Sequence, residues 1–363
     1  MPQTFRMNLG FDYKLPEDII LTVDGMYTKN LNEIFYTDLN LGDRRDTTQF
    51  GSTLPGNRGV YGIYNGRNTT ARFLDGRKSF TNVILLSNTD MGYSYNMSVQ
   101  LQKSFKAGLD LMAAYTHSAS YDINSGLSSQ AISQWRFNYV QDNPNTPTLS
   151  RSFFDIPHRL IASAAYRIEL IPEVSLKASL FYEGRSGQPF SFVYDGDMNA
   201  DGQTSNDLIY VPKDKNDIAL VTGTARASDA TFDALDRFIS SDEALNAARG
   251  TIIERNAARE PWNNRIDLRI AADIRNPFAN GHNLEVSLDI INLGSNAYRF
   301  VPNQSDAMLR FEGLARNGNT LGANGTALPV GTPLFSYRDR ENPYQFSDLL
   351  SRMQMQLGIR YSF

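Results

Sequence analysis

The sequence contains no cysteine, three histidines and two tryptophans among 363 residues. The absence of cysteine removes any thiol nucleophile and leaves the redox compartment open. His117, His158 and His282 lie far apart and form no i, i+4 pair, so they predict neither a zinc site nor a catalytic triad. The sequence also has no P-loop and no G-x-S-x-G motif. We therefore expect a protein that is not an enzyme and has no organic cofactor.

Long apolar runs and an excess of positive charge are missing as well. The best apolar run, NVILLSN around residues 83–86, is far shorter than the roughly 18 residues of a membrane-spanning helix. The formal net charge is −4, so the chain lacks the basic footprint of a nucleic-acid-binding protein. These absences argue against a helical membrane protein and against a nucleic acid partner.

What the sequence does contain is a strict alternation of apolar and polar residues. In the final segment, RMQMQLGIRYSF, every odd position from 353 to 363 is apolar or aromatic, and every even position is polar, charged or glycine. This alternation recurs along the chain and predicts nine strands of an all-β, antiparallel protein. The apolar positions of the nine strands span residues 5–13, 21–27, 93–101, 109–115, 160–168, 174–182, 266–274, 284–290 and 353–363.

The connections between these strands alternate between short and long. KLPED, KSFKAG, ELIPE and NPFANGH are short joins, whereas residues 31–90, 119–156, 195–261 and 296–348 form long ones. Alternate joins of an antiparallel meander lie at opposite ends, so the short turns share one end and the long loops share the other. Compact soluble domains seldom contain structureless loops of this length. The pattern is typical of an outer-membrane barrel with short periplasmic turns and long extracellular loops.

Periodicity alone leaves the environment of the apolar face open. In a soluble sandwich that face points into a shared core, whereas in a membrane barrel it points to lipid and the polar face lines the lumen. Strands of about 10–13 residues match the roughly 9–11 that a tilted strand needs to cross a bilayer. Aromatic residues also gather near the short-turn ends, as an interfacial girdle would: Phe11, Tyr13, Phe105, Tyr166, Tyr361 and Phe363. We favour a transmembrane barrel; a soluble, secreted, calcium-stabilised β protein is the alternative.

Several stretches carry a resemblance to a known family. They are FDIPHRLIASAAY (154–166), FYEGRSGQPFSFVYDGDMNADGQTSNDLIYVP (181–212), IIERNAAREPWNNRIDLRI (252–270), LDIINLGSN (288–296) and the terminal strand. On these residues the chain resembles the C-terminal part of a TonB-dependent outer-membrane receptor, of the type with an N-terminal carboxypeptidase-regulatory-like domain. The resemblance implies a barrel of about 22 strands, a plug inside it and a TonB-contacting segment ahead of the plug.

Two features of the chain differ from that family pattern. The sequence shows no counterpart of the plug or of the TonB-contacting segment, and nine strands is an odd number, whereas single-chain bacterial barrels have even numbers. We therefore expect residues 1–363 to be the last nine strands of a longer receptor. Tyr361 and Phe363 are similar to the terminal signal that the barrel-insertion machinery reads.

An acidic loop, DGDMNADGQTSNDL, follows the sixth predicted strand. Asp197, Asn199 and Asp201 occupy positions 1, 3 and 5 of a calcium-loop pattern, and Gly202 at position 6 permits the tight turn. The match is partial, because Leu208 stands at position 12, where the pattern has a bidentate glutamate.

Two further carboxylates add oxygen atoms to this loop. Asp207 lies one position before the expected glutamate, and Asp195 precedes the pattern. Against a metal site, Asp, Asn and Gly also form turns in which the side chains bond their own backbone. Two interpretations of the acidic loop therefore remain: a plain turn, and a calcium site made of Asp195, Asp197, Asn199, Asp201 and Asp207.

The same long loop contains a predicted helical stretch, ATFDALDRFISSDEALNAARG. Phe232, Leu235, Phe238 and Ile239 have the spacing of an amphipathic helix, and Gly250 ends a second short segment at 244–248. The stretch is interpreted either as a functional element, namely a lid over the pore mouth or a contact with an external partner, or as a loop that packs on its own small apolar cluster.

The sequence leaves three functional hypotheses. The first is TonB-dependent uptake, with outer-membrane lipid, the missing strands and plug, TonB and the insertion machinery as partners. The second is a passive porin-like or adhesion barrel, and the third is the secreted β protein. The transported ligand is not readable, since sugars, peptides and metal chelates all fit such receptors.

Overall fold

The computed structural model describes residues 1–363 apart from 72–79, 205, 224, 279, 295–299, 303–307, 317–326, 340–343 and 347–350. Parts of the predicted long loop 296–348 therefore lie outside the described residues. The same holds for single positions in the NPFANGH turn and in the acidic loop. Within the described residues, none of the helices has the length and hydrophobicity that crossing a bilayer requires.

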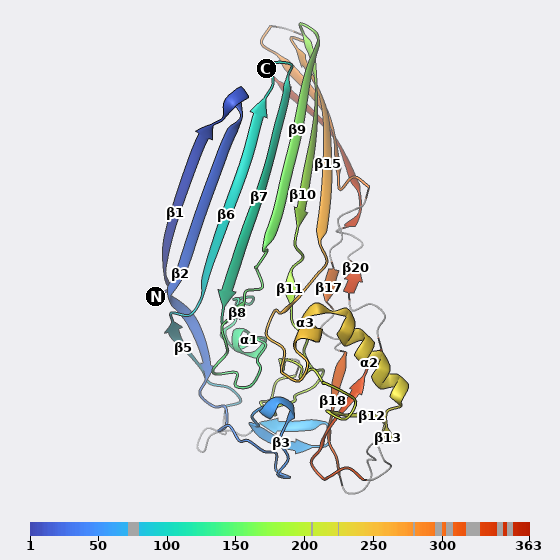
Figure 1. The fold of residues 1–363 in the computed structure, drawn as a ribbon. Helices are drawn as coiled ribbons and strands as arrows, with labels where there is room; N and C mark the ends of the chain where they lie inside the picture. Colours follow the sequence, from blue (N-terminus) through green and yellow to red (C-terminus); the bar gives the residue numbers. More distant parts are fainter. Residues whose placement is uncertain are drawn as a thin grey trace.

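All nine predicted strands form, and they lie side by side in one antiparallel sheet in the order β1-β2-β6-β7-β9-β10-β15-β16-β21 (Figure 1). Spatial order follows chain order, as in a meander. The bounds are Gln3–Lys14 (β1), Ile20–Asp38 (β2), Tyr93–Ser104 (β6), Leu109–Asp122 (β7), His158–Ile171 (β9), Val174–Arg185 (β10), Asn263–Arg275 (β15), Asn283–Ile291 (β16) and Gln354–Ser362 (β21). We call this nine-stranded sheet the wall.

Several strands of the wall extend further into the loops than the alternation predicts. β2 continues to Asp38, where its last six residues pair with β5 (Ile84–Thr89), so the first long connection begins at 39 rather than 31. Tyr36 and Ile84 of this extension pack against a buried cluster of Leu41, Tyr61 and Trp135. β8 (Ser150–Arg151) pairs with the end of β7 in the same way. The extensions carry the sheet from the wall into the loops.

The short turns lie at one end of the wall and the long connections at the other (Figure 1). The first short turn holds a single 3-10 turn, η1 (Pro16–Asp18), in which Glu17 and Asp18 have left-handed φ angles of 63° and 59°. The C-terminus lies at the turn end, and the chain enters β1 from the loop end. This arrangement confirms the alternation of short and long joins.

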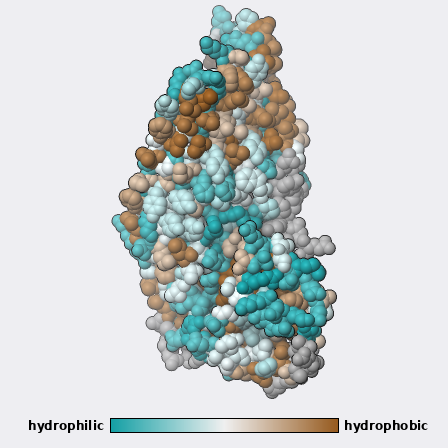
Figure 2. Space-filling model, viewed as in Figure 1, coloured by the Kyte–Doolittle hydropathy of each residue, from teal (hydrophilic) through white to brown (hydrophobic). Residues whose placement is uncertain are grey.

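The apolar face of the wall is exposed, which decides between a sandwich and a barrel. Leu9, Leu357 and Ile359 are 78%, 71% and 72% exposed, although each points to the apolar side of its strand. Figure 2 shows hydrophobic residues gathered on the strand half of the molecule, whereas hydrophilic residues dominate the loop half. An exposed apolar band of this size needs a hydrocarbon environment. The alternative of a soluble, secreted β protein is therefore wrong.

Both outer strands of the wall have one bonded neighbour among the described residues. β1 pairs with β2, and β21 pairs with β16. All twelve residues of β1 are exposed, on its polar face as well as on its apolar face. The wall is thus a sheet with two open edges.

The buried core of the protein lies in the long connections and not against the wall. Its largest cluster draws Val60 from the first connection, Val211 and Leu235 from the third, and Phe311 and Phe335 from the fourth; each is at most 2% exposed. We call the body around this core the loop cap, which consists of the described residues of 39–83, 123–157, 186–262 and 292–353.

Short elements build the loop cap. The strands pair as β3 with β4, β11 with β14, β17 with β20, and β13-β12-β19-β18 in a four-stranded sheet. Their bounds are Gly62–Asn65 (β3), Asn68–Ala71 (β4), Pro189–Phe190 (β11), Ala219–Thr222 (β12), Ala225–Arg226 (β13), Ala258–Arg259 (β14), Phe300–Pro302 (β17), Leu309–Leu314 (β18), Pro333–Tyr337 (β19) and Tyr344–Phe346 (β20). A 3-10 turn, η2 (Pro55–Asn57), and a helix, α1 (Ala131–Arg136), complete the first two connections.

The predicted helical stretch forms two helices, α2 (Asp229–Ser241) and α3 (Glu243–Ala247). Each begins at a capping side chain: Ser228 accepts from the Thr231 amide, and Asp242 accepts from the Leu245 amide at 2.9 Å. The apolar side of α2 is buried in the core of the loop cap. The helices therefore pack on an apolar cluster formed by the loops, the second of the two interpretations.

Candidate functional site

The polar face of the wall carries charges that pair across neighbouring strands. Arg269 of β15 stands directly opposite Asp289 of β16. Its guanidinium donates to both Asp289 carboxylate oxygens at 2.9 Å and to Glu285 at 2.9 Å. Alternation puts the three residues on one face, because successive strand residues point to opposite sides. These side chains are 25–43% exposed, so the network lines an open polar surface.

Other pairs continue this polar surface across the wall. Arg159 of β9 bonds Glu183 of β10 at 2.7 Å, and Arg265 bonds Asp267 at 2.8 Å. A polar lumen accommodates such charges, whereas hydrocarbon does not. The polar face is therefore the lumen face.

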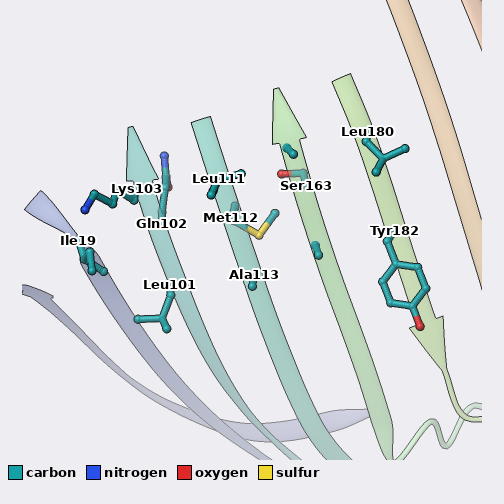
Figure 3. A pocket seen from close by; sticks show the side chains of 12 residues that line it. Ile19, Leu101, Gln102, Lys103, Leu111, Met112, Ala113, Ser163, Leu180 and Tyr182 are labelled. Atoms are coloured by element: carbon teal, nitrogen blue, oxygen red, sulfur yellow. The ribbon is translucent and has the colours of Figure 1, made fainter. Parts of the chain in front are cut away.

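The apolar face has a shallow groove of about 420 Å³ that spans four strands (Figure 3). The surface is recessed between Leu101 and Tyr182 because the small side chains of alanines 113, 162 and 164 lie between them. Two polar tips reach its rim: the Tyr182 hydroxyl, and Lys103, which lies on the same face of β6 as Leu101 and forms an ion pair with Glu17 at 2.9 Å. The rest of the lining is mostly apolar, which suits hydrocarbon.

Aromatic residues form bands at both ends of the wall. At the turn end Tyr361 stacks on Phe363 at 5.9 Å and contacts Phe278 and His282. The other band, at the loop end, was missed in the sequence. It contains Tyr93 stacked on Tyr121 at 5.1 Å, and the Tyr115 hydroxyl bonded to His158 at 2.7 Å, next to His117. The three histidines thus belong to aromatic bands, which explains their scattered positions in the sequence.

The acidic loop is buried inside the loop cap. Asp197, Asn199 and Asp201 are at most 5% exposed. The Asp197 carboxylate accepts from the amides of Asp201 at 3.1 Å and Gly202 at 3.0 Å, and from the Thr69 hydroxyl. Asp201 in turn accepts from the Gln203 amide at 2.8 Å and the Asn206 side chain at 2.9 Å. Gly202 has a φ of +90°, which a residue with a side chain would adopt only under strain.

Burial raises the pKa of three carboxyl groups in this loop. The pKa of Asp197 lies well above its usual value because of burial first and the nearby Asp201 and Asp207 second. Burial and Asp207 raise the pKa of Asp201 to about 7. Burial also raises the pKa of Asp207, although Arg58 opposes the shift. Three carboxyl groups thus share a site in which ionisation is costly.

Two of the predicted calcium ligands have other partners. Asp207 forms a fully buried ion pair with Arg58 at 2.6 Å, and its other oxygen accepts from the Met198 amide at 2.8 Å. The Asp195 carboxylate forms ion pairs with Arg338 at 2.9 Å and with Arg310 at 3.4 Å. Across the described part of the chain, no three Asp, Glu, His or Cys side chains converge to hold a metal ion. Asp197, Asn199 and Asp201 stay together as the candidate.

Buried ion pairs connect loops that are distant in the sequence. Arg58 of the first connection reaches Asp207 of the third, and Arg255 of the third reaches Asp122 at the end of β7 at 2.6 Å. Both pairs are at most 10% exposed. Nothing in the local sequence indicates these partners, since the members of each pair lie 149 and 133 positions apart.

An antiparallel sheet with an exposed apolar face, a charged polar face and aromatic bands at both ends is the wall of a transmembrane β-barrel. The family model for an outer membrane beta barrel domain matches residues 1–322. The chain therefore belongs to this outer-membrane β-barrel family, and it resides in the outer membrane of Gram-negative bacteria. No curated protein and no solved structure matches the chain.

Proposed function

We propose that this chain forms part of the wall and the outer cap of a TonB-dependent receptor that takes up a ligand actively, and that it catalyses no reaction. The observation that carries the proposal is the combination of a charged, open wall with an ordered cap. In outer-membrane barrels the long loops face outwards and the short turns face the periplasm. The loop cap then meets the ligand from outside.

The open edges of the wall support further strands in the working protein. β1 and β21 each present a row of backbone groups without a strand partner among the described residues. A spanning sheet cannot leave such an edge in lipid, because each unsatisfied backbone group costs several kcal/mol. Additional strands would close the barrel, and a barrel of about 22 strands has a lumen wide enough for a plug.

The lumen face supports a polar partner inside that barrel. Arg269, Glu285 and Asp289 are paired with one another but only part-buried. A plug domain would contact this surface and would separate from it when TonB transmits energy from the inner membrane. A surface of part-exposed ion pairs suits a contact that must be released, because each such pair contributes only about 0–1 kcal/mol.

The base of the loop cap offers a polar pocket for a ligand. The pocket has a volume of about 200 Å³ and presents the side chains of Ser125, Gln134, Asn138 and Asn256 next to Tyr139. Amide and hydroxyl groups beside an aromatic ring suit a sugar or a peptide, and both classes stay open.

The terminal strand supports the insertion machinery as a second partner. Phe363 is 94% exposed, and Tyr361 stacks on it at the periplasmic end of β21. An exposed aromatic terminus beside an open strand edge is available to another protein. We propose that Tyr361 and Phe363 form the signal for barrel assembly.

Conductance in planar bilayers tests uptake against the alternative of a passive channel. Protein extracted from outer membranes should give no steady current, and urea should open the pore by displacing the plug. TonB should also co-purify with the protein from wild-type cells. A steady open-pore current without urea, together with no association with TonB, would establish the passive barrel instead.

A further inference from the structure

The acidic loop holds two buried carboxylates without a cationic partner. Arg58 compensates Asp207, but among the described residues no lysine or arginine pairs with Asp197 or Asp201. Burying ionised groups without a counter-charge is costly. When both carboxyl groups are ionised, the site therefore carries two negative charges that no cationic side chain compensates.

The fold of the loop gives these carboxylates the arrangement of a cation-binding turn. Position 1 of the pattern, Asp197, is bonded to the amides of positions 5 and 6. The Asn199 carboxamide is turned to the same place, since its oxygen accepts from the Asp201 amide at 2.9 Å and its nitrogen donates to the Asp201 carboxylate at 3.2 Å. Side chains at positions 1, 3 and 5 supply the ligands in calcium loops of this type.

A second, independent observation is an unpaired oxygen in the same cluster. Asn206 is 1% exposed, and its Oδ1 has no hydrogen-bond partner, although its Nδ2 donates to Asp201 at 2.9 Å. A buried carbonyl oxygen without a partner costs about 1–3 kcal/mol. This oxygen belongs to the carboxamide whose nitrogen contacts the Asp201 carboxylate, and a bound cation would satisfy it, whereas a further acceptor would not.

We propose that Asp197, Asn199 and Asp201 bind one calcium ion in the loop cap, with the Asn206 amide beside them. Oxygen ligands on a tight turn suit calcium, which accepts irregular geometry, better than magnesium, which requires a near-ideal octahedron. We exclude Asp195 and Asp207 from the ligand set, because their carboxylates already form ion pairs with arginines. The site is independent of the proposed uptake function.

The ion holds three long connections together. The Tyr61 amide of the first connection donates to the Asn199 carbonyl at 2.8 Å, and the Tyr64 hydroxyl donates to the Met198 carbonyl at 2.9 Å. A Cβ on Gly62 would lie 2.4 Å from the Ala200 carbonyl oxygen, so the β3–β4 hairpin sits directly on the acidic loop. From the second connection, Val140 pairs with Asp207. Calcium therefore makes the cap rigid on the outside of the cell.

Limited proteolysis of isolated outer membranes tests the site. The wild-type loop around 195–212 should be cut at least tenfold more slowly in calcium at about 1 mM, the range of extracellular sites, than in EGTA. Magnesium at the same concentration should give little protection. Equal protection by both ions would indicate that divalent ions act through the lipid surface, and it would overturn the proposal.

Matched variants in the same loop separate binding from folding. Asp197→Asn and Asp201→Asn should each weaken calcium binding about tenfold or more, measured by terbium luminescence and calcium competition, because ligand charge sets affinity. Asp195→Asn, the same change two residues before the pattern, should bind as the wild type does. Emission from Trp135, which is 2% exposed, reports whether the cap stays folded. Absence of terbium binding to a folded wild-type cap, or an equal loss in Asp195→Asn, would overturn the proposal.

Discussion

The wall and the loop cap use the same apolar residues in opposite ways. Leu357 of the wall is 71% exposed, whereas Leu235 of the loop cap is 0% exposed. The wall is stabilised by backbone pairing between long strands and turns its leucines to lipid. The cap has short strands and helices, and its stability comes from apolar burial in water. One chain thus contains a part stabilised in lipid and a part stabilised in water.

Charges follow the same division. In the cap, Arg58 and Asp207 are 1% and 0% exposed, and Arg58 also donates to the Leu208 carbonyl. In the wall, Arg269 is 43% exposed beside Asp289 and Glu285. A buried pair holds its loops strongly because a single member cannot be left alone. A part-exposed pair is weak, and it can exchange partners with water or another surface.

The largest effect should come from breaking the buried pair in the cap. Arg58→Met leaves the Asp207 carboxylate buried without its cation, which should cost about 3–5 kcal/mol of cap stability. Pulse proteolysis of the loops in urea, in isolated outer membranes, measures this loss. Arg44→Met is the control, because the Arg44–Asp142 pair is 36% and 37% exposed and should contribute about 0–1 kcal/mol. Equal losses in the two variants would contradict the division between buried and exposed pairs.

The next effect concerns the apolar core of the cap. Leu235→Ala should destabilise the loops by about 2–5 kcal/mol through lost burial and the cavity that remains. Leu127→Ala, at a position that is 60% exposed, should stay within about 0.5 kcal/mol of the wild type. The same pulse proteolysis gives both values. A wild-type urea midpoint for Leu235→Ala would mean that the cap is not held by its core.

The third effect tests the lipid face of the wall. Leu357→Arg puts a guanidinium into hydrocarbon and should cost about 2–4 kcal/mol near the bilayer midplane. Gln356→Arg adds a charge to the opposite, lumen face and should be mild. Fraction folded after refolding of the complete receptor into lipid vesicles measures both. Because the sequence has no cysteine, single cysteines at 356 and 357 can carry a fluorophore, and a quenching lipid should dim the label at 357 alone. Equal quenching at both positions would refute the assignment of faces.

The smallest effect should come from the lumen network. Arg269→Gln should cost about 0–1 kcal/mol, and the cost should shrink further at high salt because the pair is part-exposed. Urea unfolding of the barrel at low and high ionic strength measures it. If the variant instead lost several kcal/mol of stability at both low and high salt, Arg269 would have to be desolvated, for example against a plug.

The strands and their connections were predictable because the signal is local. Alternation with period 2 is set by the pleat, so residues such as Leu284, Val286 and Leu288 reveal a strand without knowledge of its neighbours. The helix caps at Ser228 and Asp242 are local for the same reason. Strand ends were less predictable: the β2 extension depends on β5, about fifty residues away.

The candidate site was predictable in part. The spacing of Asp197, Asn199, Asp201 and Gly202 is a local pattern, and the structure keeps these residues together. The other engagements of Asp195 and Asp207 depend on arginines in distant loops, which no spacing rule reveals. The aromatic band around Tyr115 and His158 was missed because its members come from different strands and meet only in the sheet.

The sequence by itself determined nine antiparallel strands, the position of each short turn between them and the two faces of each strand, because a strand needs only the residues i and i+2 to define a face. The tertiary structure alone decided that the apolar face is exposed, that three long connections share one buried core and that Arg58 meets Asp207 across 149 positions. The physical reason is that burial and charge pairing depend on what lies within a few ångströms in space, and in long loops the sequence separation carries no information about that distance.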